Sequence, residues 1–179
     1  LRHYLQKIFG PDHPVLRRPV TQGDVVTTIV KTVKGKTIVI TNDMVLPRPY
    51  DNRWLIQGTG GIYSQEHGAV YIEGRSPKSH EWESFASYQK EFEHALWRNA
   101  PADIEQRGHG GPDYLELEGF VQAVRAKGPL PLDIYDSVTM SSVVALSEQS
   151  IAQGGAPVEC PDFTRGRWET RKPYFALDM

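Results

Sequence analysis

A glycine-rich segment that places a histidine and an aspartate four residues apart is the strongest candidate for chemistry. It reads Gly108-His109-Gly110-Gly111-Pro112-Asp113, and a proline suits the first position of a helix. The glycines would let the backbone approach a ligand closely. His109 could hydrogen-bond a hydroxyl or exchange a proton near neutral pH. Asp113 would be stabilised as a carboxylate by the helix end. From spacing alone, a binding loop and a glycine-rich helix cap with an incidental histidine are equally good interpretations.

A second candidate segment is Leu46-Pro47-Arg48-Pro49-Tyr50. Its two prolines stiffen the chain, and a stiff loop can present Arg48 and Tyr50 in fixed directions. The Tyr50 hydroxyl can donate or accept a hydrogen bond, and its ring could stack against a sugar. The alternative is a chain reversal with Tyr50 packed at the edge of the surface.

No complete catalytic set, cofactor site or metal site can be recognised in this sequence. The segment closest to a dinucleotide loop is Gly58-Thr59-Gly60-Gly61, but it lies between two short predicted strands. A pyrophosphate site needs a helix N-terminus directly after the glycines, so we predict a turn. The sequence also lacks zinc-type Cys/His spacing and a Gly-x-Ser-x-Gly nucleophile motif. We therefore expect no cofactor and no metal to be bound by this chain alone.

Elements predicted from periodicity and turn residues would position these segments. Helices are expected at residues 1–9, 81–97, 112–127 and 133–153, and strands at 24–33, 36–42, 54–57, 61–63, 70–73 and 157–159. Strands and helices are grouped rather than alternating, which favours an α+β fold. We expect one domain over residues 1–179, an open and largely antiparallel sheet with helices packed on one face. The other face would then be covered, for example by another subunit.

Composition excludes several classes of protein. The chain has 179 residues and a formal net charge of -2, whereas a general nucleic-acid binder carries a strongly basic face. No apolar run approaches the ~20 residues of a membrane-spanning helix. A single cysteine excludes an internal disulfide. We therefore expect neither nucleic acid nor membrane as a partner.

Seven segments in the same order resemble the C-terminal half of the Gfo/Idh/MocA oxidoreductase superfamily. Within it they are most similar to glycoside hydrolase family 109, the NAD-dependent α-N-acetylgalactosaminidases. The resemblance extends from about Gln22 to Trp168. It is carried by Thr28 to Asp43, Pro47 to Tyr50, Gln57 to Gly61, Tyr71 to Gly74, His80 to Trp82, His109 to Asp113 and Pro161 to Gly166.

The resemblance implies a two-domain parent in which an N-terminal Rossmann domain binds NAD. The C-terminal domain would shape the sugar site and form homo-oligomers through its sheet. Tyr50 and His109 match family positions that face the substrate, and Arg48 and Asp113 are possible supporting residues. The implied chemistry is transient oxidation of the sugar 3-hydroxyl, elimination of the aglycone, addition of water and re-reduction.

Other features of the family pattern are missing or altered. The family's Tyr-x-x-His motif and its dinucleotide fingerprint have no counterpart here, and the chain starts with Leu1 rather than Met. We therefore expect the Rossmann domain to be absent from this chain. Pro112 stands where a bulkier apolar residue is expected.

Two other interpretations stay open at this point. One is a domain of an NAD(P)-dependent sugar or inositol dehydrogenase, because the superfamily shares this domain. The other is a non-catalytic oligomerisation module, because no complete catalytic set lies within the chain. The compartment is left undecided between the bacterial cytoplasm and periplasm.

Overall fold

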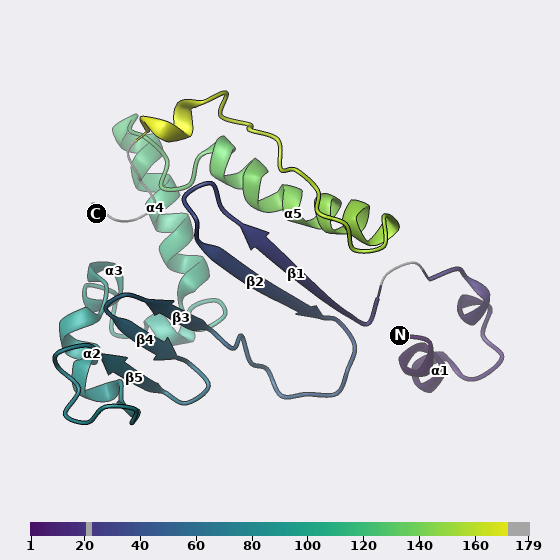
Figure 1. Cartoon of the computed structure of the whole chain (residues 1–179), viewed down its shortest axis with the longest axis horizontal. Helices are drawn as coiled ribbons and strands as arrows, with labels where there is room; N and C mark the ends of the chain where they lie inside the picture. The colour runs from purple at the N-terminus through teal and green to yellow at the C-terminus, as the bar shows by residue number, and fades with distance from the viewer. Residues whose placement is uncertain (21–22, 172–179) are drawn as a thin grey trace. The chain divides into compact units, whose positions relative to one another are not determined.

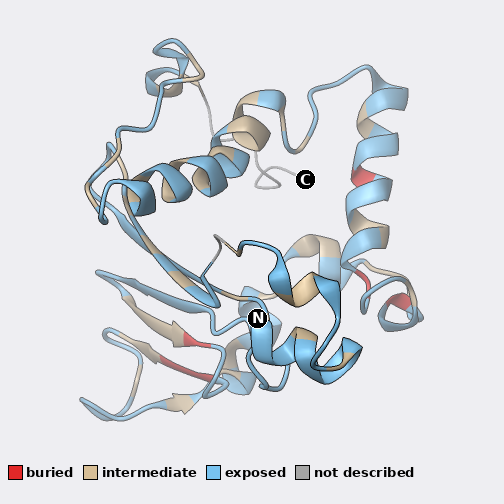
Figure 2. Ribbon diagram, turned by 90° about the vertical axis from the view of Figure 1, so that its right-hand side faces the viewer, coloured by how far each residue is buried: buried red, intermediate tan, exposed pale blue. Residues whose placement is uncertain are grey.

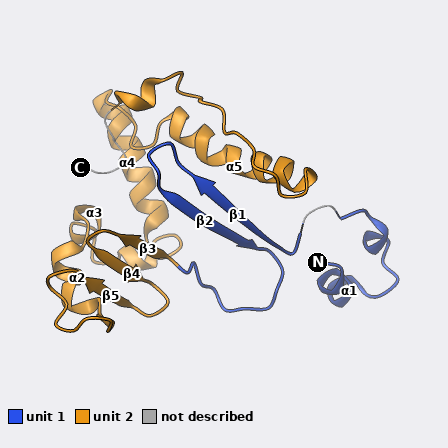
Figure 3. Cartoon of the chain, in the orientation of Figure 1, with its two compact units in different colours: residues 1–53 blue, residues 54–179 orange. Residues whose placement is uncertain are grey.

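The computed structural model describes residues 1–20 and 23–171. The chain divides into two compact units, Leu1–Arg53 and Trp54–Met179 (Figure 3). The elements follow the order drawn in Figure 1. Five α-helices and open antiparallel sheets make up the described part of the chain, which confirms the α+β class. Two predictions, that helices pack on one sheet face and that the whole chain acts as one domain, stay predictions.

The first unit contains helix α1 (Arg2–Phe9), a short 3-10 helix η1 (Pro14–Arg17) and one hairpin. Strands β1 (Val25–Lys31) and β2 (Thr37–Asp43) pair antiparallel, with Ile29 opposite Val39. β-Branched residues dominate both strands because they fit a pleated surface. The predicted turn at Lys34-Gly35 is wider in the structure. Thr32 closes it, since its backbone N–H donates to the Lys36 carbonyl at 2.8 Å and its hydroxyl accepts from the Lys36 N–H at 3.0 Å.

The second unit is built on a four-stranded antiparallel meander in the order β3-β4-β5-β6. The strands are β3 (Leu55–Gly58), β4 (Gly61–Ser64), β5 (Ala69–Ile72) and β6 (Glu83–Ser84). Buried residues in the described part of the chain are few (red in Figure 2). Ala69, Val70 and Ser64 on the two central strands are among them, together with Ile104 in the 3-10 helix η2 (Ile104–Gln106).

The prediction of one continuous helix over residues 81–97 is wrong. Residues Glu83–Ser84 instead form β6 and pair with β5, and helix α2 (Ala86–Phe92) begins only afterwards. A second break follows at His94, whose backbone is extended and whose ring Nδ1 accepts from the Leu96 N–H at 3.2 Å. His94 thereby caps helix α3 (Ala95–Arg98). The apolar spacing was that of a helix, but two local hydrogen-bond arrangements divide the segment.

Two longer helices complete the second unit. Helix α4 (Pro112–Ala126) and helix α5 (Ile134–Ala152) lie within two residues of their predicted bounds. Asp133 caps α5 by accepting from two backbone N–H groups at 2.8 and 3.1 Å, as aspartate does at helix starts. A 3-10 helix, η3 (Arg167–Glu169), follows. The strand predicted at residues 157–159 is wrong, because this described segment is irregular.

The described helices bear on the expected absence of a membrane partner and on the surface of α4. None is long and apolar enough to cross a membrane in the part of the chain that the structure describes. Several apolar residues of α4 are exposed rather than buried, among them Leu117 at 66% and Val124 at 55%. This helix therefore presents an uncovered apolar face.

Candidate functional site

Tyr50 lies on the loop that follows β2. The Asp43 carboxylate organises this loop, since it accepts from the Leu46 N–H at 3.1 Å and from the Arg48 guanidinium at 3.2 Å. The same guanidinium donates to the backbone carbonyls of Pro49 and Asp51, at 3.5 and 3.3 Å. Arg48 thus holds the segment on both sides of Tyr50. The Tyr50 side chain itself is 90% exposed, so it is available to contact a ligand.

His109 lies on the loop that enters helix α4. The loop has left-handed backbone from Gly108 to Gly111, with φ of 29°, 44°, 82° and 111° in turn. A non-glycine residue rarely adopts such a conformation, and it is retained only where the surroundings enforce it. A backbone hydrogen bond of 2.8 Å from the Gly111 N–H to the Gly108 carbonyl closes the turn. On this turn the imidazole is exposed to solvent: the His109 side chain is 88% exposed.

Two glycines of this loop are required by close packing. A Cβ on Gly111 would lie 2.7 Å from Ile104 Cγ1 and 3.2 Å from Trp97 Cζ3. A Cβ on Gly108 would lie 2.8 Å from Asp113 Oδ2. The shortest distance at each glycine, 2.7 Å at Gly111 and 2.8 Å at Gly108, is below any ordinary contact of a Cβ atom, so neither position accepts a side chain without a local shift. The glycines therefore fit the loop to the helix rather than only permitting a turn.

His109 and Asp113 form a pair across the first turn of α4. The distance from His109 Nδ1 to Asp113 Oδ2 is 2.7 Å. This hydrogen bond, and the attraction of the carboxylate charge, raise the pKa of His109 above its ordinary value. The pair can therefore bind a hydroxyl group and hold a proton close to neutral pH.

The structure places Tyr50 and Arg48 in the first unit and His109 and Asp113 in the second. Within each unit it brings the predicted pair together, Arg48 around the Tyr50 loop and Asp113 against His109. The use of one substrate by both units stays a prediction.

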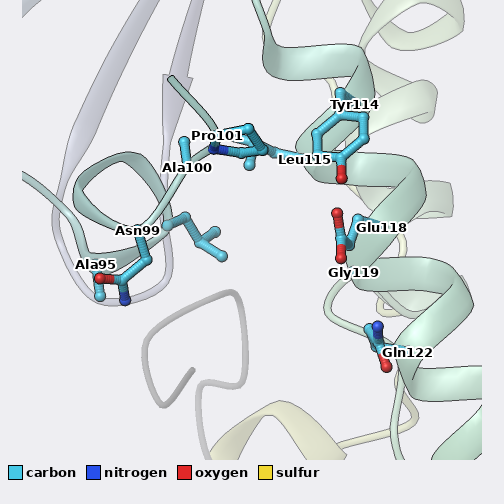
Figure 4. A pocket seen from close by; sticks show the side chains of 10 residues that line it. Ala95, Asn99, Ala100, Pro101, Tyr114, Leu115, Glu118, Gly119 and Gln122 are labelled. Carbon is cyan, nitrogen blue, oxygen red and sulfur yellow. The ribbon is translucent and has the colours of Figure 1, made fainter. Parts of the chain in front are cut away.

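A recess that sequence reasoning did not find lies along α4 (Figure 4). Its volume is about 290 Å³, and α3 with the loop after it forms the other wall. Small residues create the space. The lining consists of Ala95, Leu96, Asn99, Ala100, Pro101, Tyr114, Leu115, Glu118, Gly119 and Gln122. His109 and Asp113 of the same unit are not among the lining residues.

The glycine-rich segment closest to a dinucleotide loop does not fit the pyrophosphate of NAD. The segment Gly58–Gly61 is a hairpin turn, in which Gly58 pairs with Gly61. A Cβ on Gly61 would lie 2.2 Å from the Tyr71 carbonyl oxygen, so this glycine is needed for strand packing. No helix follows the turn, and a helix N-terminus is what would bind a phosphate. The described residues also contain no cluster of three or more metal-ligating side chains.

Comparisons with known proteins agree with the segments described above. The family model "Glycosyl hydrolase 109, C-terminal domain" matches residues 1–170. A "Glycosyl hydrolase family 109 protein" of Stenotrophomonas maltophilia is 46% identical over 94% of the chain and 37% of its own length. An "Alpha-N-acetylgalactosaminidase" of Tannerella forsythia is 43% identical over 94% of the chain and 36% of its own length.

The chain thus spans little more than a third of the length of these curated relatives. The matched region includes both candidate loops, and it covers the hairpin, the meander and the two long helices. The chain belongs to the glycosyl hydrolase 109 C-terminal domain family.

Proposed function

We propose that this chain is the substrate-side domain of an NAD-dependent glycosidase that acts on α-N-acetylgalactosaminides. The observation that carries the proposal is the match to the C-terminal family over residues 1–170, with a similar protein named alpha-N-acetylgalactosaminidase. Transient oxidation of the sugar 3-hydroxyl, elimination and re-reduction is the chemistry proposed for the longer protein. Because the Gly58–Gly61 turn does not fit a pyrophosphate, an N-terminal Rossmann domain would bind NAD in this proposal.

In this proposal, Tyr50 and His109 bind the sugar from two loops. Tyr50 offers an exposed ring and hydroxyl on a loop held by Arg48. His109 offers an exposed imidazole held by Asp113. Aromatic rings and side chains that hydrogen-bond hydroxyl groups are the groups by which a protein binds a sugar. Both residues can therefore contribute substrate binding without supplying a complete catalytic set.

The test is release of nitrophenol from a nitrophenyl α-N-acetylgalactosaminide. It uses the intact protein, meaning this chain together with the proposed N-terminal Rossmann domain. We expect Tyr50→Phe and His109→Gln to lower kcat/KM at least tenfold, which corresponds to about 1.4 kcal/mol of lost transition-state stabilisation. Tyr4→Phe, at a tyrosine that is 46% exposed, is the matched control and should leave turnover unchanged. An intact protein that releases no nitrophenol from this substrate would contradict the proposed function.

A dehydrogenase that shares the same domain is the rival among enzymes. A glycosidase of the proposed type returns the hydride within each turnover and therefore shows no net change in NADH absorbance. A dehydrogenase accumulates NADH in proportion to the sugar consumed. Recording absorbance during turnover of the intact protein separates the two.

An assembly role is the second candidate, and one observation favours it. Ile29 and Val39 lie opposite each other on one face of the hairpin and are 71% and 62% exposed. Exposed apolar patches mark interaction surfaces, and the sheet face is the surface proposed for homo-oligomers. Ile29→Lys should then reduce the mass measured by light scattering. Val33→Lys, a change at a 77% exposed residue outside both strands, is the control.

A further inference from the structure

The hydrogen bond between His109 and Asp113 fixes the position of one proton on the imidazole. A carboxylate can only accept a hydrogen bond, so the 2.7 Å contact requires the proton to be on Nδ1 of His109. In the neutral ring, the other nitrogen, Nε2, then carries the lone pair. In the charged ring both nitrogens carry protons. Nε2 is therefore the ring atom whose proton comes and goes.

Among the residues that the structure describes, Asp113 is the charged group that shifts the pKa of His109. Arg107, the nearest cation in sequence, donates to Asp103 at 3.0 Å and lies over the Tyr114 ring at 4.5 Å. Glu118, on the next turn of α4, raises the pKa of Tyr114. The pKa of His109 is raised by the hydrogen bond that its ring donates to Asp113 and by the charge of that carboxylate, and desolvation opposes the rise. Asp113 is thus the charged group that acts on the imidazole.

The loop is shaped for this contact and not only for a helix start. Gly108 leaves space for Asp113 Oδ2, which a Cβ at residue 108 would approach within 2.8 Å. His109 keeps a left-handed backbone with φ of 44°, a conformation that costs free energy in a non-glycine residue. The Nε2 atom has no hydrogen-bond partner among the residues that the structure describes. It therefore remains available to a ligand.

We propose that Asp113 is a positioning residue that keeps a proton on Nδ1 of His109 and presents Nε2 as the acceptor for a substrate hydroxyl. The identity of that hydroxyl as a sugar hydroxyl rests on the proposed function. The Nδ1 proton and the direction of Nε2 rest only on the geometry of the loop. The two parts can be tested separately.

The experiment is ¹⁵N NMR of the histidine rings in the intact protein labelled with ¹⁵N-histidine. His109→Gln identifies the signals of His109 by their loss. Wild type, Asp113→Ala and Asp113→Asn are titrated, and the share of the Nδ1–H tautomer and the pKa of His109 are read from the shifts. Glu116→Gln is the matched control, because it removes a carboxylate from an exposed position on the same helix.

We expect the wild-type neutral ring to be mainly the Nδ1–H tautomer. Asp113→Ala should lower both that share and the pKa of His109, and Asp113→Asn should lower the pKa by removing the charge while keeping the shape. Glu116→Gln should change neither value by a comparable amount. An unchanged tautomer in Asp113→Ala, or an equal change in the control, would overturn the proposal.

Turnover gives the second measurement. The pH-rate limb that belongs to His109 should move to lower pH in Asp113→Asn, because the carboxylate raises the pKa in the wild type. The limb should stay in place in Glu116→Gln. If the intact wild type cleaves no α-N-acetylgalactosaminide, the proposed function is wrong. The tautomer measurement then still decides whether Asp113 positions His109.

Discussion

Replacing Gly111 by alanine tests how the loop of His109 is supported. A Cβ at residue 111 would lie 2.7 Å from Ile104 Cγ1, 3.1 Å from the Ile104 carbonyl oxygen and 3.2 Å from Trp97 Cζ3. Ile104 is one of the few buried apolar residues, with 9% exposure. The change therefore forces a methyl group into a packed position, at a φ of 111° that alanine disfavours.

Two costs add up at this position. A residue held in a sparsely populated backbone region costs on the order of 1–3 kcal/mol. Inserting a carbon into packed surroundings costs typically about 1–3 kcal/mol more. Gly110→Ala provides the matched control, because Gly110 has a φ of 82° but no atom within 4 Å of its Cβ position. The difference between the two variants isolates the packing cost, so we expect Gly111→Ala to lose about 1–3 kcal/mol more.

Urea unfolding followed by tryptophan fluorescence measures both losses, with the free energy of unfolding taken from the midpoint and slope. Trp97 contacts the altered position and should report a change in its folded-state emission in Gly111→Ala. Equal losses of free energy in the two variants would refute the packing described for this loop.

Two more predictions concern other contacts of the second unit. Gly108→Ala should push the Asp113 carboxylate away from His109, because the new Cβ would lie 2.8 Å from Oδ2; NMR titration should then show a lower His109 pKa. Arg171 donates to Asp136 at 2.8 Å and lowers the pKa of that carboxyl. A carboxyl whose pKa is lowered by folding stabilises the folded state at pH values above its unfolded pKa of about 3.9. This stabilisation is lost as the pH falls through the folded-state pKa. Arg171→Gln should therefore reduce the urea midpoint at pH 7, and its difference from wild type should vanish near the acid limit. A difference that persists there would contradict this assignment.

Elements with local signals were predicted well from the sequence. The hairpin follows from β-branched residues on both sides of a glycine turn, and α5 follows from Asp133 at its start and Gly154 after its end. These interactions join residues close together in the sequence, so the sequence pattern alone indicates them. The helix expected over residues 81–97 failed because its first part pairs with β5, a partner more than ten residues away. Spacing alone cannot show such pairing.

The candidate site shows the same division. Spacing placed His109 and Asp113 at the start of a helix, and the structure has α4 begin at Pro112. The 2.7 Å contact between them depends on left-handed backbone and on clearances at Gly108 that no residue pattern reveals. Arg48 was an expected supporting residue, but the contacts by which it holds the Tyr50 loop were not visible, because they depend on the Asp43 carboxylate at the end of β2.

The pairing of His109 with a residue of α4 also has a mechanical consequence. The helix has 15 residues, so at about 1.5 Å per residue it is a rod of roughly 22 Å. The imidazole is joined to one end of this rod by the Asp113 carboxylate. The apolar face with Leu117 and Val124 lies further along the same rod and is exposed. Any molecule or segment that binds this face and tilts the helix would turn His109 with it, and so set the direction of the imidazole without approaching the substrate.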